Sequence, residues 1–97
     1  EDNVATPTRL LGNYPNPFNP STTISFTTAK AAPVQITIYN LKGQAVRTWN
    51  LETEVGGNHS VQWDGLDDNG LSLSSGVYFY RMFSGAYSST RKMVLMK

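Results

Sequence analysis

The residues in this sequence that could carry out chemistry are few, and they do not form a catalytic set. The single histidine, His59, follows a glycine pair, whereas nucleophilic catalysis requires a base held beside its nucleophile. Serines are frequent, but Ser74 and Ser75 belong to a turn, and no G-x-S-x-G motif is present. There is also no cysteine to serve as a nucleophile or a thiolate ligand. The sequence therefore predicts no catalytic residue and no enzyme.

One acidic cluster has the oxygen ligands that calcium prefers. It consists of Asp64, Asp67, Asp68 and Asn69. Leu66 occupies the place where a D-x-[DN]-x-[DN]-G loop has its second ligand, so the spacing departs from that motif. Aspartate and asparagine side chains also close turns by bonding to the backbone, and this interpretation is preferred. We expect no cofactor and no metal, with calcium as the alternative.

The aromatic residues raise the possibility of a sugar-binding surface. Trp63 alternates in phase with Val61, which indicates a core position. Only Trp49, with Tyr39 or Tyr87, is then left to form a stacking platform. A carbohydrate-binding or adhesive module is therefore an alternative function.

Period-two alternation of apolar and polar residues indicates the elements that must position these side chains. Turn sequences rich in Gly, Asn, Asp and Ser separate the alternating segments, and no helical pattern is present. Strands are expected near Leu10 and over 22–28, 33–40, 44–53, 59–64, 76–84 and 87–96. Seven short strands predict an all-β, immunoglobulin-like β-sandwich. Its expected core is Ile24, Phe26, Ile36, Ile38, Val61, Trp63, Tyr78 and Tyr80.

Two local sequences refine this fold. Gly76 and Tyr78 have the spacing of a tyrosine corner, and Tyr80 stands where antibody domains have their second cysteine. Upstream, three prolines exclude a helix and a central strand from the segment LLGNYPNPFNPST. We expect this segment to be a rigid lead-in that packs Phe18 inward. Residues 1–9 are expected to be the end of a linker and residues 10–97 one domain.

Charge and hydropathy exclude several partners. Eight basic and seven acidic residues give a net charge of +1, too small to attract nucleic acid, and no apolar run approaches the about 20 residues of a membrane span. Nucleic-acid binding and direct membrane insertion are therefore not expected. All acidic residues lie at or before Asp68, so the C-terminal part is locally basic.

The last residues are apolar on both faces of their expected strand. Met93 and Leu95 share one face, and Val94 and Met96 share the other. Either both faces are buried, or the strand is an exposed edge that a partner binds. The second interpretation makes the C-terminal strand a recognition element whose basic residues meet acidic groups on the partner. That element consists of Arg91, Lys92, Met93, Val94, Leu95, Met96 and Lys97.

Five sequence blocks resemble the type A C-terminal sorting domain of type IX secretion. They begin at Leu11 (LGNYPNPFNP), Ile38 (IYNLKGQ), Trp63 (WDG), Ser75 (SGVYFY) and Lys92 (KMVLMK). Related immunoglobulin-like domains, including that of the flagellar hook-capping protein, share the middle blocks, so the first and last blocks discriminate between these families. The motif residues are Asn16, Pro17, Phe18, Asn19, Pro20, Gly43, Gly76 and Tyr78.

The resemblance implies a non-catalytic module that directs a larger secreted protein through the outer membrane. Its partners would be an outer-membrane translocon, a sortase-like protease and the N-terminal cargo domains. The module would pass through the periplasm and reach the cell surface or the medium. An inert immunoglobulin-like spacer within a secreted enzyme is a further alternative.

Overall fold

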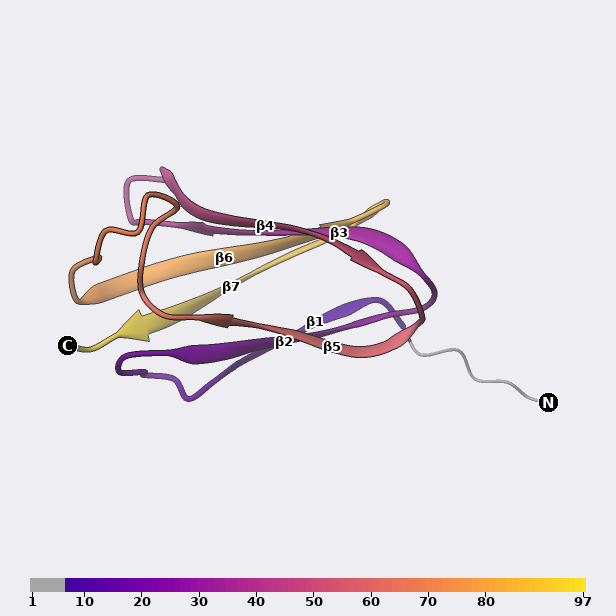
Figure 1. The fold of residues 1–97 in the computed structure, drawn as a ribbon, viewed down its shortest axis with the longest axis horizontal. Helices are drawn as coiled ribbons and strands as arrows, with labels where there is room; N and C mark the ends of the chain where they lie inside the picture. The colour runs from indigo at the N-terminus through magenta and orange to yellow at the C-terminus, as the bar shows by residue number, and fades with distance from the viewer. Residues whose placement is uncertain (1–6) are drawn as a thin grey trace.

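Seven β-strands and no helix make up the part of the chain that the computed structural model describes, residues 7–97 (Figure 1). The strands are β1 (Arg9–Tyr14), β2 (Thr22–Thr28), β3 (Ala32–Tyr39), β4 (Ala45–Thr53), β5 (Gly57–Trp63), β6 (Gly76–Ser84) and β7 (Tyr87–Leu95). Each expected strand is present, with bounds shifted by at most two residues at the expected starts and ends. No helix in residues 7–97 is therefore available to cross a membrane.

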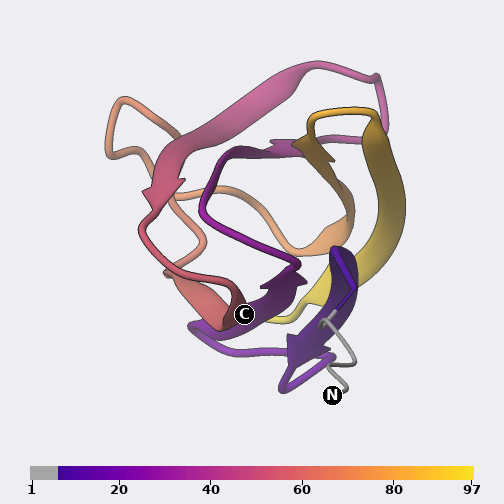
Figure 2. The same ribbon diagram turned by 90° about the vertical axis from the view of Figure 1, so that its right-hand side faces the viewer.

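The strands form two antiparallel sheets that pack face to face. One sheet has the order β1-β2-β5 and the other the order β4-β3-β6-β7. The edge strands β1 and β7 belong to different sheets but lie side by side (Figure 2). This arrangement confirms the predicted β-sandwich.

The core lies between the two sheets. It is formed by the side chains of each sheet that face the other sheet. Six of the expected core residues, including Trp63 and Tyr80, are at most 1% exposed, and Tyr78 is 5% exposed. Val61 is only half-buried, because it lies on the edge strand β5, and packs against this cluster. The Trp63 ring lies 5.4 Å from the Phe18 ring and 5.5 Å from the Tyr78 ring. Aromatic side chains thus pack together in a core that contains no disulfide, since the sequence has no cysteine.

The folded domain begins slightly before the expected boundary. Arg9 is the first residue of β1, and the Pro7 carbonyl and the Thr8 hydroxyl accept hydrogen bonds from Thr27 and Ala29. Residues 1–6 of the expected linker lie outside the described residues.

The tyrosine corner is formed as the sequence predicts. The Tyr78 hydroxyl donates a hydrogen bond of 2.7 Å to the Ser74 carbonyl, across the turn that leads into β6. This bond fixes the start of β6, the strand that pairs with both β3 and β7.

We expect Tyr78→Phe to lower the free energy of unfolding by about 1 kcal/mol, because the Ser74 carbonyl loses its partner in a half-buried site. Tyr14→Phe is the matched control, because Tyr14 is 83% exposed. Urea unfolding of both variants measures the difference. Equal stabilities would contradict a structural role for the Tyr78 hydroxyl.

Candidate functional site

The C-terminal end of β7 is joined to the proline-rich segment by a set of hydrogen bonds that we call the clasp. It comprises Asn16–Phe18 and Val94–Met96. The Phe18 N–H donates to the Val94 carbonyl at 2.9 Å, and the Met96 N–H donates to the Phe18 carbonyl at 2.9 Å. The Val94 N–H donates to the Asn16 side-chain oxygen at 3.0 Å. The two segments, 78 residues apart, thus form one unit.

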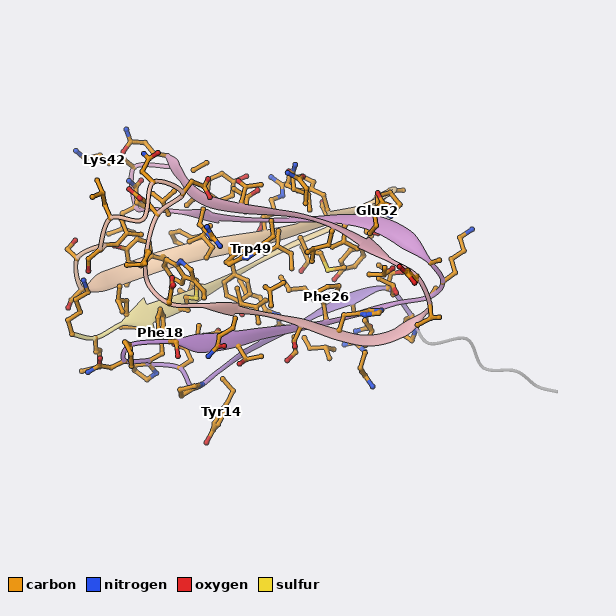
Figure 3. All side chains as sticks on the ribbon, viewed as in Figure 1. Tyr14, Phe18, Phe26, Lys42, Trp49 and Glu52 are labelled. Carbon is orange, nitrogen blue, oxygen red and sulfur yellow. The ribbon has the colours of Figure 1, made fainter. Side chains whose placement is uncertain are left out.

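The proline spacing explains why this segment makes a short bridge and not a full strand. Pro15, Pro17 and Pro20 have no N–H to donate, so only isolated residues between them can pair with β7. Asn16 supplies a side-chain oxygen, and Phe18 supplies both of its backbone groups. The Phe18 side chain is 1% exposed and points between the sheets near the end of β7 (Figure 3), which confirms its predicted inward packing.

The two faces of the last strand differ. Met93 and Leu95 are buried in the core, whereas Val94 is half-buried and Met96 is 54% exposed. The expectation of an exposed edge is wrong at Val94 and Met96, because the clasp already uses their outward backbone groups. What β7 offers a partner at its end is therefore the side chains of its outer face.

The basic residues of this end have different environments. The Arg91 guanidinium Nε donates to the Leu10 carbonyl at 3.2 Å, and Lys97 bonds through its backbone to Ser75 and through its ammonium to Ser72. Lys92 is exposed on the outer face of β7. Among residues 7–97, no carboxylate forms an ion pair with any of these three side chains. Their positive charge is available to an acidic partner.

Side chains also connect β1 with β7 and with the neighbouring strand β6. The Leu10 N–H donates to the Tyr87 hydroxyl at 2.8 Å, and the Tyr80 hydroxyl donates to the Asn13 side-chain oxygen at 2.9 Å. Burial raises the pKa of Tyr80 to about 12, although the positive charge of Arg91 acts in the opposite direction. Tyr80 is therefore a neutral hydrogen-bond donor at physiological pH.

The raised pKa gives the stability of the domain a specific pH dependence. The neutral Tyr80 phenol stabilises the fold below its ordinary pKa of 10.0, and this contribution is lost as the pH rises through about 12. Between about pH 9 and about pH 12 we expect the wild type to lose about 2 kcal/mol more unfolding free energy than Tyr80→Phe. Urea unfolding across this range is the measurement. Parallel losses in both proteins would contradict the assignment.

The chain matches the model of the FlgD Ig-like domain over residues 13–87. This match covers most of the strands, all of the middle sequence blocks and the first block from Asn13 onward. The chain belongs to the FlgD Ig-like domain family. Residues 88–97, which contain the end of β7, lie outside the matched range. No curated protein matches the chain.

Solved structures show the same fold as this FlgD Ig-like domain. Dimeric latent PorU from Porphyromonas gingivalis is 22% identical with a TM-score of 0.75, and the similarity covers 87% of this chain and 9% of PorU. PorZ, an essential surface component of the type-IX secretion system of P. gingivalis, is 21% identical with a TM-score of 0.60, over 88% of this chain and 11% of PorZ. FlgD from Xanthomonas campestris, described in hook capping and flagellar assembly, is 19% identical with a TM-score of 0.65, over 90% of this chain and 64% of FlgD.

In this FlgD Ig-like domain the acidic cluster closes turns, as the preferred interpretation of the sequence expects. Asp67 accepts from the N–H groups of Asn69 and Leu71, each at 2.9 Å. Asp64 accepts from Leu66, and Asp68 accepts from Thr48 on β4. The carboxylates therefore hold the loop between β5 and β6 against the edge of β4. The motif glycine Gly43 has a similar local role, since it closes the β3–β4 turn with a φ of +82°.

The remaining candidate residues are not brought together. His59 bonds to the Thr28 hydroxyl and the Val55 carbonyl. The Ser74 carbonyl accepts from the Tyr78 hydroxyl, and the Ser75 hydroxyl accepts from the Lys97 N–H.

The aromatic residues do not form one stacking platform. Trp63 is fully buried, and Trp49 packs against the core under the Arg47 guanidinium, 4.9 Å away. Tyr39 pairs with Phe79 on the opposite face of the same sheet, and Tyr87 bonds to Leu10.

Sequence reasoning did not find the Asn16 contribution to the clasp. An asparagine before a proline predicts a local turn, and nothing in the sequence indicates that its side chain bonds to residue 94. Only the folding of β1 and β7 side by side brings the two together.

Proposed function

We propose that this domain is a non-catalytic sorting module, which directs a larger secreted protein through the outer membrane to the cell surface. One observation carries the proposal. The first and the last of the sequence blocks that resemble a type IX sorting domain bond to each other in the clasp. These blocks therefore form one surface at one end of the molecule.

Membership of the FlgD Ig-like domain family is compatible with this proposal but does not by itself imply a sorting role. The match to the FlgD Ig-like domain ends at residue 87, so the family model does not include the last block. A domain of the same fold occurs in PorZ, a surface component of the type-IX secretion system. A likeness at 21% identity concerns the fold, and the sorting role rests on the clasp and its sequence blocks.

In this proposal the domain folds in the periplasm and presents the outer face of β7 to the translocon. The buried Met93 and Leu95 anchor the strand in the core, while the exposed Lys92 and Met96 are available for contact. The cargo precedes the domain, and a sortase-like protease acts after translocation. The domain itself contributes recognition and no catalysis.

The proposal is tested by fusing residues 1–97 behind a periplasmic reporter in a bacterium with type IX secretion. We expect the reporter to reach the surface or the medium, measured as the fraction accessible to external protease. The matched control is the reporter fused to residues 1–97 in a strain without the translocon, where it should remain periplasmic. Retention in the periplasm of both strains, with a folded domain, would contradict the proposal.

A further inference from the structure

A second feature of this end of the molecule is a groove between β1 and β7. Its volume is about 460 Å³. Gly12 and Asn13 of β1, Asn16 of the clasp, and Arg91 and Lys92 of β7 line it. The two strands lie side by side here without backbone pairing between them (Figure 2).

The groove exists because β1 bends away from β7. The register between β1 and β2 shifts between Leu10 and Gly12, and Gly12 has a φ of +136°, which favours glycine. At one end the Tyr87 hydroxyl and the Arg91 guanidinium bond to the backbone of Leu10. At the other end the clasp holds β7. The bulge therefore separates β1 from β7 over a short stretch, between the contacts at Leu10 and the clasp.

Backbone hydrogen-bonding groups of β7 face this groove. The N–H and carbonyl of Val94 point away from β6 toward the clasp, and backbone direction alternates along an antiparallel strand. The N–H and carbonyl of Lys92, two residues earlier, therefore point to the same side. No bond within residues 7–97 uses them outside the sheet. They form the part of this edge that lies next to the clasp and is left open by it.

The charge of the groove is positive. Arg91 commits its Nε to Leu10, which leaves the four N–H groups of its two terminal nitrogens. Lys92 adds a second cation, and none of the groove-lining residues within 7–97 is a carboxylate. The acidic residues of the described chain lie on β4, on the turn after it and on the β5–β6 loop. The groove therefore attracts an anionic, acceptor-rich ligand.

We propose that the groove binds an extended peptide segment that carries an aspartate or glutamate. The peptide backbone pairs with the Lys92 N–H and carbonyl, and the carboxylate accepts from Arg91. A free anion would leave the Lys92 carbonyl without a donor, so a peptide fits better. The bound peptide segment belongs to the protein that recognises the domain during export, and in this respect the inference rests on the proposed function.

A binding titration of the folded domain tests this inference without export. The probe is the peptide acetyl-TETET-amide, and the matched peptide is acetyl-TQTQT-amide, with binding followed by NMR shifts of backbone amides. We expect the acidic peptide to shift Gly12 and Lys92 and to bind about tenfold more tightly than the neutral one. Arg91→Gln and Lys92→Gln should each weaken it about tenfold, whereas Arg81→Gln, which removes an exposed charge from β6, should not.

Lys92→Gln keeps the test valid if Arg91→Gln fails to fold, because Lys92 is exposed. Equal binding of both peptides, equal weakening by Arg81→Gln, or full competition by inorganic phosphate would each overturn the inference. Export of the reporter fusion without peptide binding would overturn this inference and leave the proposed function intact. Peptide binding without export would contradict the proposed function and leave the peptide-binding site intact.

Discussion

Phe18→Ala is expected to lower the free energy of unfolding by about 3–5 kcal/mol. The Phe18 side chain is 1% exposed and packs on the Trp63 ring, so truncation leaves a cavity between the sheets. The same residue supplies both backbone bonds of the clasp. We therefore expect the loss of packing to loosen the end of β7 as well, and the Met96 amide to lose its protection from hydrogen exchange.

Leu41→Ala is the control for this prediction, because Leu41 is 70% exposed and its truncation removes surface contacts only. Its effect should stay within about 0.5 kcal/mol. Urea unfolding gives the free energies, and hydrogen exchange gives the local protection. A loss below about 1 kcal/mol for Phe18→Ala would show that the proline-rich segment is not part of the core.

The sequence predicts β2, β3 and β6 well because each has a clear alternation with one buried face. Ile24 and Phe26 on β2, and Ile36 and Ile38 on β3, are all at most 1% exposed. The Tyr78 corner was also predictable, since its spacing within the chain is local. These features depend on residues a few positions apart, where sequence patterns carry direct information.

The edges of the sheets could not be predicted in the same way. The sequence indicated that the last strand is apolar on both faces, and it left open whether that strand is buried or exposed. In the structure one face of this strand is buried and the other is not, since Met93 lies in the core and Met96 is exposed. The occupied edge at Val94 depends on Asn16, and the groove depends on a bulge at Gly12. Pairings between the two ends of the chain leave no local pattern.

The structure also changes how the sorting role should be tested. Deleting Lys92–Lys97 would remove the core residues Met93 and Leu95, so lost export would be inseparable from lost folding. A triple variant of exposed residues, Lys92→Glu, Met96→Ser and Lys97→Glu, changes the recognition surface and keeps the core. We expect it to reduce surface display about tenfold, because it reverses two charges that meet the partner.

The matched control carries the same three kinds of substitution at exposed residues at the opposite end of the sandwich: Arg9→Glu, Lys30→Glu and Val55→Ser. The decisive measurement is the displayed fraction of reporter fusions bearing each triple variant, with the melting temperature of each purified domain. Reduced display for the β7 variant alone, with both domains as stable as each other, is the expected result. Unchanged display of a folded β7 variant, or an equal loss in the control, would contradict the claim that the end of β7 directs sorting.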